Sequence, residues 1–436
     1  MNAAVDVARV GLWGHRVGAV ALDNAGVGVF EYDANFLKLG LDIAPITMPL
    51  EEARSGHMLH SFPALNRETF KHLPGLLADS LPDKFGQAIV NTWLARQGRS
   101  PDDFSTIERL CYTGSRAMGA LEFMPAVIQN LDRAVDINID EMVNLVREVI
   151  SHRNQINVKL TNDDQENQDA LLDILRIGTS AGGARAKAVI AYNENTGAVM
   201  SGQAEVPAGF SHWLLKFDGA SDIELGETAG YGRIEYAYYQ MAQAAGINMM
   251  ESRLLEENSR AHFMTRRFDR VDGNKLHLQS LCALAHYDFN MAGAYGYEQA
   301  LMIMRKIKLS KKEQLQLYRR MVFNVIARNQ DDHTKNIAFL MNHDGEWSLS
   351  PAFDMMYSYN PTGEWTDKHQ MTVNGKRDQF TKEDLLKVAM SSDLKGAEDV
   401  IQEVLDAVER WPDFARQAGV DKKRIKKITK LHRIKF

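Results

Sequence analysis

The stretch that decides the fold is a polar loop, Asn329-Gln330-Asp331-Asp332-His333-Thr334-Lys335-Asn336. It follows an apolar, helix-patterned segment at 317–327, so it lies at the end of an element, where functional residues are often held. Asp331 and Asn336 stand five positions apart in this loop. Phosphoryl-transfer enzymes place a catalytic base and a magnesium ligand on one loop at this spacing. The neighbouring Asp332 is expected to point elsewhere and to be structural.

A second acid, Asp354, ends the stretch 350–354 (SPAFD). Residues 337–341 and 347–349 read as two strands around a turn at 343–345, which predicts a β-hairpin. Because a hairpin brings its ends together, we expect Asp354 to lie close to Asn336. Two carboxylates and an amide then converge, and these groups suit magnesium. The pattern indicates an ATP- and Mg²⁺-dependent kinase, with Asp331 as the catalytic base and with Asn336 and Asp354 as metal ligands.

The composition is that of a globular protein with a sizeable core. The chain has 436 residues, of which 45% are hydrophobic and 25% charged, so two or three domains are expected. The net charge of -6 argues against non-specific nucleic-acid binding by the whole protein. Cys111 and Cys282 belong to no metal-binding cluster, which favours a reducing compartment. No apolar run reaches the roughly 18 residues that span a bilayer. We therefore expect a cytoplasmic protein without membrane contact.

The predicted elements change in type along the chain. Residues 5–45 contain short strands with glycine turns, and further strands are predicted at 186–193, 198–201 and 212–217. From about residue 279 onward helical patterns dominate, at 279–286, 296–305, 311–328, 382–391 and 396–411. A β-rich first half and an α-rich second half indicate an α+β protein with two lobes and a cleft between them.

A glycine-rich loop precedes the apolar strand at 188–191. The backbone amides of such a loop can surround phosphate groups, although this loop matches neither GxxxxGK[ST] nor GxGxxG. The candidate nucleotide-binding residues of the loop are Ser180, Ala181, Gly182, Gly183, Ala184, Arg185 and Lys187.

Lys216 lies in the apolar strand 212–217, downstream of that loop. Kinases hold the nucleotide phosphates with a lysine in such a strand, and a glutamate from the next helix pairs with it. Glu235, in the helix predicted at 231–245, is placed to supply that carboxylate. A lysine whose stem packs along the sheet while its head reaches water is the alternative. Between the lobes, the segment 263–270 passes from apolar to charged residues, and a linker of this kind could offer backbone groups to adenine.

The segment 421–436 carries a concentrated positive charge. It contains eight lysines and arginines and one acid. The spacing of Lys423, Lys426, Lys427 and Lys430 around apolar residues predicts an amphipathic basic helix. Such a helix is either simply solvated or contacts nucleic acid or an acidic partner.

Taken together, these segments resemble the HipA family of bacterial serine/threonine kinases, the toxin halves of toxin–antitoxin pairs. The matching segments run in order over essentially the whole chain. They are 30–33 (FEYD), 76–83 (LLADSLPD), 118–121 (MGAL), 180–187 (SAGGARAK), Lys216, 267–270 (RFDR), 331–336 (DDHTKN) and 350–354 (SPAFD).

The resemblance implies a two-lobed, protein-kinase-like fold with three domains. These are a small extra N-terminal subdomain at 1–125, a β-rich kinase N-lobe at 126–265, and an all-α C-lobe at 266–436. It also implies that the loop 180–187 covers the nucleotide phosphates and that Lys216 contacts them. The adenine pocket would be lined by Arg266 and Phe268, the catalytic base would be Asp331, and magnesium would be bound by Asn336 and Asp354.

The resemblance further implies regulation and partners. Ser180 aligns with the serine that family members autophosphorylate. Members commonly pair with a small helix-turn-helix, HipB-like antitoxin that represses their operon, so operator DNA is an expected partner through that complex. Known protein substrates include an aminoacyl-tRNA synthetase. Two departures, Ala186 in place of a common proline and Arg266 in place of an occasional glutamate, leave the catalytic set intact.

Two other functions fit parts of the sequence. The pattern Asp-x-His-x-x-Asn-Ile at 331–337 also resembles the catalytic loop of phosphoinositide kinases, which would make the acceptor a lipid. A non-catalytic, DNA-binding corepressor with a vestigial site would instead give weight to the basic segment. The joint presence of Lys216, Asp331, Asn336 and Asp354 argues against a vestigial site.

Overall fold

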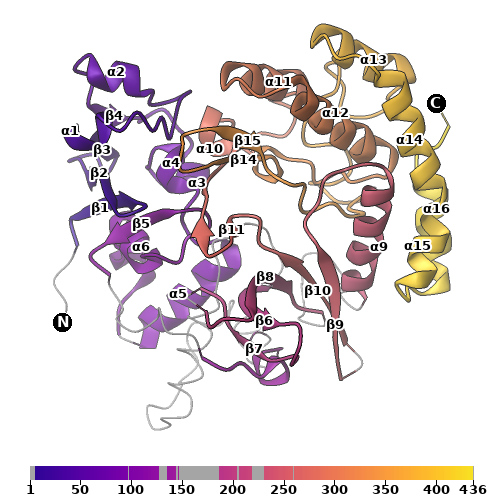
Figure 1. Cartoon of the computed structure of the whole chain (residues 1–436), viewed down its shortest axis with the longest axis horizontal. Coiled ribbons are helices and arrows are strands. Elements are labelled where there is room, and N and C mark those ends of the chain that lie inside the picture. Colours follow the sequence, from indigo (N-terminus) through magenta and orange to yellow (C-terminus); the bar gives the residue numbers. More distant parts are fainter. Residues whose placement is uncertain are drawn as a thin grey trace.

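The computed structural model describes residues 5–96, 98–126, 135–143, 146, 186–203, 206–218, 230–258 and 260–435. The predicted loop residues Ser180, Ala181, Gly182, Gly183, Ala184 and Arg185 lie outside these ranges. In Figure 1 the N-terminal part lies at the left, a second sheet at the bottom and the C-terminal helices at the right.

The N-terminal part is built on a five-stranded antiparallel sheet in the order β4-β3-β2-β1-β5. Buried residues alternate along β1, where Ala8, Val10 and Leu12 face the core, as one face of a strand requires. The strands are β1 (Val7–Leu12), β2 (His15–Leu22), β3 (Gly28–Tyr32), β4 (Leu59–Ser61) and β5 (Leu121–Met124). The helices of this part are α1 (Ala34–Leu37), α2 (Leu50–Arg54), α3 (Arg67–Phe70), α4 (Gly75–Ala78), α5 (Lys84–Arg96), η1 (Pro101–Asp103) and α6 (Thr106–Thr113).

A second antiparallel sheet, in the order β7-β6-β8-β10-β9, forms the N-lobe. Helix α9 packs directly on β10. Gly232 permits this close packing because it has no side chain, and any side chain there would collide with the carbonyl oxygen of Ala261. The elements are β6 (Lys187–Asn193), β7 (Val199–Ser201), β8 (Phe210–Lys216), α9 (Tyr231–Ala244), β9 (Ser252–Glu257) and β10 (Arg260–Arg266). The strands predicted at 186–193, 198–201 and 212–217 and the helix at 231–245 are therefore confirmed within one or two residues.

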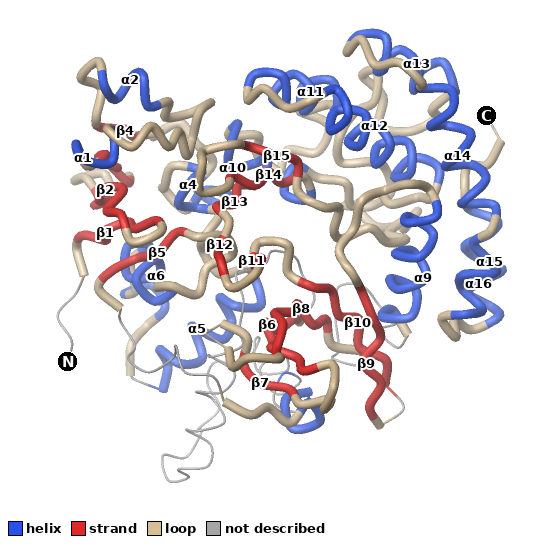
Figure 2. The backbone as a smooth tube through the Cα atoms, viewed as in Figure 1, coloured by secondary structure: helices blue, strands red, loops and turns tan. Residues whose placement is uncertain are grey.

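The C-terminal part is mainly helical, as Figure 2 shows. The expectation of an all-α C-lobe needs one correction, because the predicted hairpin pairs with a third strand in the sheet β13-β14-β15. The strands are β11 (Arg270–Val271), β12 (Asn274–Lys275), β13 (His277–Ser280), β14 (Ala338–Met341) and β15 (Trp347–Leu349). The helices are α10 (Leu281–Ala285), α11 (Tyr297–Lys306), α12 (Lys311–Ile326), η2 (Thr334–Asn336), α13 (Lys382–Ser391), α14 (Ala397–Glu409), α15 (Trp411–Gln417) and α16 (Lys422–Leu431).

A buried ion-pair cluster joins the N-terminal part to the segment between the lobes. Asp269 accepts two hydrogen bonds from Arg267, at 2.8 and 2.6 Å, and one from Arg270 at 2.6 Å. It also accepts the backbone N–H of Gly119 at 2.7 Å. Burial opposes the charge of Asp269, but the two guanidinium groups outweigh it and hold its pKa well below the usual range. The segment 267–270 thus anchors the N-terminal sheet to the rest of the molecule.

None of the helices in the described ranges is long and apolar enough to cross a membrane.

Candidate active site

Lys216, at the end of β8, is the central cation of the site. Its ammonium donates to Oε1 of Glu235 on α9 at 2.5 Å, so the predicted partner is in contact. Both side chains are buried. Helix α9 packs closely on β10, which is the neighbour of β8 in the sheet, and this packing brings Glu235 within reach of Lys216. A lysine–glutamate pair between a strand and the adjoining helix is the arrangement that kinases use to hold nucleotide phosphates.

Asp354 contacts the same lysine from the C-terminal part. Its Oδ1 pairs with the Lys216 ammonium, so one cation bridges two carboxylates from opposite lobes. Burial opposes the charge of Lys216, but Asp354 and Glu235 outweigh it and raise the lysine pKa above its usual value. Burial likewise opposes the charge of Asp354, but Lys216 and Lys187 lower the pKa of that carboxyl to about 2. Both groups are therefore charged at neutral pH.

The backbone at Asp354 has an unusual conformation. Its φ is +52°, in the left-handed region that residues other than glycine seldom adopt. The side-chain amide of Asn329 donates to the Asp354 carbonyl at 3.3 Å. Residues in such conformations persist where the surrounding structure fixes them, and they cluster at functional sites. The side chain of Asp354 contacts Lys216 from this conformation.

The loop 329–336 is held in place by Ser358. Its hydroxyl accepts the backbone N–H groups of Gln330 at 2.8 Å and Asp331 at 3.0 Å, and it donates to Asn329 Oδ1 at 3.0 Å. The amide nitrogen of Asn336 donates to the Asp331 carbonyl at 2.7 Å, which closes the loop across five residues. That bond uses the nitrogen of Asn336, so its Oδ1 is the atom suited to a metal ion.

The side chain of Asp331 is 42% exposed and is contacted by Trp365. The indole N–H of Trp365 donates to Asp331 Oδ1 at 2.6 Å, and His333 Nε2 lies 3.7 Å from the same oxygen. Both contacts fall on Oδ1, which leaves Oδ2 as the oxygen that could face an acceptor hydroxyl. The segment that follows Asp354 therefore covers one side of the proposed base. Trp365 did not stand out in the sequence, because a lone tryptophan in a polar segment carries no spacing signal.

Asp332 is structural, as expected. It is buried and accepts hydrogen bonds from the Tyr297 hydroxyl at 2.9 Å, from the Gln370 backbone at 2.8 Å and from His369 Nδ1 at 2.9 Å. The other ring nitrogen of His369, Nε2, faces the guanidinium of Arg433 at 3.0 Å. Because arginine only donates, Nε2 accepts this bond and Nδ1 carries the proton toward Asp332. The residue next to the proposed base is thus fixed by side chains from distant parts of the chain.

Three further residues were predicted to bind the nucleotide, namely Phe268, Arg266 and Lys187, and they lie in different surroundings. Phe268 packs against Phe353, the residue before Asp354, with ring centroids 5.6 Å apart. Arg266 lies exposed at the end of β10. Lys187 is buried at the start of β6 and lies opposite Lys216 in the sheet register. The structure therefore brings Lys187, Lys216, Asp354 and the loop 331–336 together, and it leaves the side chain of Arg266 at the surface.

The donor set fits magnesium bound together with phosphate. In the described part of the chain there is no group of three or more His, Cys, Asp and Glu side chains that would hold a metal by itself. Magnesium in kinases needs only one or two carboxylates, with phosphate oxygens and water completing its shell. The Asp354 carboxylate and the Asn336 amide oxygen provide such a partial set. The low pKa of Asp354 keeps it in the anionic form that a metal requires.

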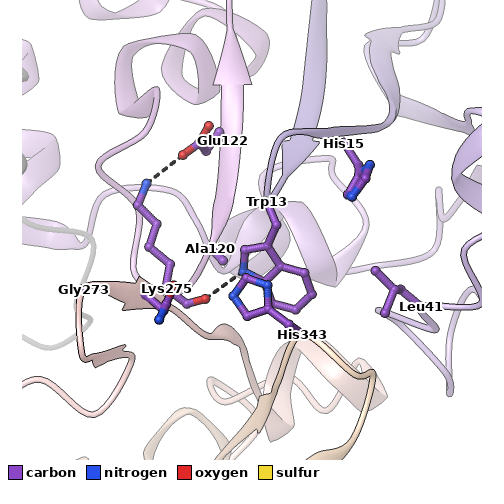
Figure 3. Close-up of a pocket in the computed structure, with 9 residues that line it drawn as sticks. Trp13, His15, Leu41, Ala120, Glu122, Gly273, Lys275 and His343 are labelled. Carbon is purple, nitrogen blue, oxygen red and sulfur yellow. Dashed lines mark hydrogen bonds and ion pairs between the residues drawn. The ribbon is translucent and has the colours of Figure 1, made fainter.

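A separate pocket of about 310 Å³ lies between the N-terminal sheet and the β14–β15 turn (Figure 3). The rings of Trp13 and His343 stack in it at 4.1 Å, and Lys275 pairs with Glu122 at 2.7 Å. Trp13 Nε1 also donates to the Lys275 carbonyl at 2.7 Å. The lining residues form a set distinct from the predicted site residues, and their mutual contacts indicate a joint between domains.

The architecture and site together define a two-lobed, protein-kinase-like fold with an additional N-terminal domain. The chain belongs to the HipA family. The family model of the HipA N-terminal domain matches residues 8–124, and that of the HipA-like C-terminal domain matches residues 179–426.

Two solved structures are similar to this chain. One belongs to the Shewanella oneidensis MR-1 toxin–antitoxin complex of HipA, HipB and operator DNA, with 15% identity, a TM-score of 0.65, and coverage of 97% of this chain and 95% of that chain. The other is the Helicobacter pylori proinflammatory kinase CtkA, with 13% identity, a TM-score of 0.34, and coverage of 57% and 89% respectively. Comparison with the curated proteins gives no match.

Proposed function

We propose that this protein is an ATP- and Mg²⁺-dependent serine/threonine protein kinase that acts as the growth-inhibiting toxin of a HipA-type toxin–antitoxin pair. The observation that carries the proposal is the position of Lys216 between Glu235 and Asp354, one from each lobe, beside the Asp331–Asn336 loop. Lys216 and Glu235 are buried and Asp354 is half-buried, and charged groups gathered in this way are costly unless they serve a ligand.

Each residue has a defined part in this proposal. Bound Mg-ATP supplies the transferable phosphoryl group and neutralises the charge that develops on it. Lys216, held by Glu235, binds the nucleotide phosphates. Asp354 and the amide oxygen of Asn336 hold the metal. Asp331 takes the proton of the acceptor hydroxyl on Oδ2, while Trp365 orients the carboxylate through Oδ1.

The biological role is proposed by family membership and by the Shewanella complex. A HipB-like helix-turn-helix antitoxin is the proposed protein partner, and operator DNA is reached through that complex. The proposed substrate is a protein, with an aminoacyl-tRNA synthetase as one candidate. Autophosphorylation of Ser180, within the glycine-rich loop, is the proposed means of self-inactivation. The proposed location is the cytoplasm.

The test is transfer of label from γ-labelled ATP to protein by the purified chain, compared with an Asp331→Asn variant. Loss of a general base lowers the rate by about 10²–10⁴-fold. Nucleotide binding is expected to persist, because the amide oxygen of the substituted side chain still accepts the Trp365 hydrogen bond. Asp344→Asn, in the exposed hairpin turn, serves as the control. An Asp331→Asn rate within about threefold of wild type contradicts the assignment of the base.

The same assay separates the alternatives. Label that enters phosphoinositide vesicles but not protein would identify a lipid kinase. ATP that is neither bound nor consumed would identify a non-catalytic corepressor. Phosphoproteomics after controlled expression of wild type and Asp331→Gln then identifies the protein substrate.

A further inference from the structure

Asp83 is a buried acid of the N-terminal domain whose position the proposed mechanism does not explain. It precedes α5 and caps it, because Oδ1 accepts the backbone N–H of Gly86 at 2.7 Å. The other oxygen, Oδ2, is buried and has no hydrogen-bond partner among the described residues. It lies 3.8 Å from the ammonium of Lys187, and both side chains are only 2% exposed.

Lys187 is a buried lysine beside the proposed phosphate site. It lies directly opposite Lys216 across the β6–β8 pair, so the two side chains project from the same face of the sheet. Lys216 is neutralised by Glu235 and Asp354. In the described part of the chain, the carboxylate paired with Lys187 is Asp83. The N-terminal domain therefore supplies the counter-charge to a lysine of the N-lobe.

We propose that Asp83 is a positioning residue of the nucleotide site, whose carboxylate holds the Lys187 ammonium charged and directed toward the nucleotide phosphates. This inference rests on the proposed function. It makes the N-terminal domain a part of the phosphate-binding machinery.

The distance between the two groups supports this role. At 3.8 Å the contact is an ion pair and is too long for a hydrogen bond. Asp83 therefore stabilises the positive charge without taking up any of the three N–H donors of Lys187. Asp83 therefore leaves those donors to phosphate oxygens, which bind ammonium groups through short, charge-assisted hydrogen bonds.

Burial acts against the charge of both groups, and each group opposes that effect on the other. Burial lowers the pKa of Lys187, and Asp83 is the strongest influence that opposes this. Burial raises the pKa of Asp83, and Lys187 opposes that in turn. A buried lysine deprived of its carboxylate tends to lose its proton, and a neutral amine no longer attracts phosphate.

Other contacts already attach the N-terminal domain to the C-terminal part. Asp79 accepts the backbone N–H of Ser280 at 2.7 Å and its hydroxyl at 3.0 Å. Asn66 donates to Asp288 at 2.7 Å. These bonds reach the C-terminal part, whereas Asp83 reaches Lys187 in the N-lobe. Asp79 therefore provides a control that perturbs domain attachment without touching Lys187.

The test measures the affinity of ATP and of adenosine by calorimetry. Asp83→Asn removes the charge and keeps an oxygen for the helix cap. We expect it to weaken ATP binding by about tenfold or more, and to leave adenosine binding within about twofold, because adenosine has no phosphates. Asp79→Asn should leave both affinities close to wild type. Thermal unfolding without nucleotide checks that each variant is folded, and Asp83→Ser replaces Asp83→Asn if the latter does not fold.

A double-mutant cycle identifies the route of the effect. Lys187→Met alone should weaken ATP binding at least as much as Asp83→Asn, and the double variant should bind ATP no more weakly than Lys187→Met. Additive effects, equal weakening for ATP and adenosine, or unchanged ATP affinity in Asp83→Asn would overturn the role of Asp83 alone. A wild-type protein that binds neither ATP nor adenosine would overturn the proposed function and this inference with it.

Discussion

Lys187 and Lys216 face each other across neighbouring antiparallel strands, and both are buried. Like charges in directly opposite positions destabilise a sheet unless anions compensate them. Three carboxylates from three parts of the chain do so, namely Asp83, Glu235 and Asp354. The pair of lysines is thus maintained at a cost in folding, which the proposed binding of nucleotide phosphates would explain.

The first prediction concerns Asp354. Asp354→Ala removes a proposed metal ligand and also frees Lys216 from one carboxylate. Magnesium should therefore no longer improve nucleotide binding, while affinity for ATP in the presence of EDTA should stay the same or increase. Calorimetric titrations with Mg-ATP and with ATP in EDTA measure both quantities. If magnesium strengthens binding equally in the variant and wild type, Asp354 is structural.

The second prediction concerns Ser180. Incubation with Mg-ATP should add one phosphate to the wild-type chain and none to Ser180→Ala or Asp331→Gln, as intact mass would show. A phosphate adds about -1.5 to -2 charges at neutral pH, so it should compete with ATP for cations such as Lys187 and Lys216. Nucleotide affinity should fall in the phosphorylated protein. Thr179→Ala is the control for the neighbouring hydroxyl. A phosphate gained by Ser180→Ala would move the site elsewhere.

The third prediction concerns the exposed face of α16. Ile425 and Ile428 pack into the core, whereas Lys426 and Lys430 are exposed, so the predicted amphipathic helix is confirmed and its DNA contact stays a prediction. Substitution of these two lysines by glutamine tests the contact without disturbing the core. The salt slope of operator binding by the antitoxin complex should fall by about 0.9 for each phosphate that the protein no longer neutralises.

A matched pair of exposed lysines on α13, Lys382 and Lys387, gives the control for this measurement. Their substitution by glutamine removes the same charge from another helix and should leave the slope unchanged. Equal slopes for wild type and the α16 variant would show that this helix is merely solvated.

The fourth prediction concerns stability in acid. His277 is fully buried, and burial lowers its pKa from 6.5 to about 4. Because the folded protein disfavours the imidazolium form, its stability is complete above about pH 6.5 and declines as the pH falls toward 4. The loss from this residue is about 3 kcal/mol in the free energy of unfolding.

Urea unfolding at pH 7 and pH 4.5 measures this effect. His277→Gln should be less stable at pH 7 but should lose less stability on acidification than wild type. His57→Gln, at an exposed position, is the control. An unchanged difference between the two pH values in His277→Gln would assign the acid sensitivity to other groups.

Local patterns in the sequence predicted much of this architecture. The hairpin, the catalytic loop and the strand of Lys216 are set by residues close together in the chain, so alternation and spacing reveal them. Glu235 was also predictable, because it is the only acidic residue in the helix predicted at 231–245. The extra strand β13 was not, since its pairing with β14 joins distant segments.

The contacts of Asp83 and Trp365 could not be predicted for the same reason. Asp83 reaches Lys187 from another domain, and Trp365 reaches Asp331 from a segment without regular structure. Pairings of this kind depend on how whole domains pack, and a single sequence contains no periodic signal for them. The position of Arg266 in an adenine pocket stays a prediction, and its side chain lies exposed at the end of β10.

Arg433 contacts His369, which in turn hydrogen-bonds to Asp332, so the support of Asp332 depends on a residue that is translated late. Arg433 also donates its backbone N–H to Ile326 at 2.9 Å, and Arg328 donates to Leu431 at 2.8 Å. During synthesis the N-terminal parts emerge from the ribosome and fold first. At that stage the chain lacks these supports, because Arg433 and Leu431 have not yet been added. We therefore expect the loop 329–336 to reach its final geometry only after the last residues have been translated, so that the proposed kinase activity would appear late in synthesis.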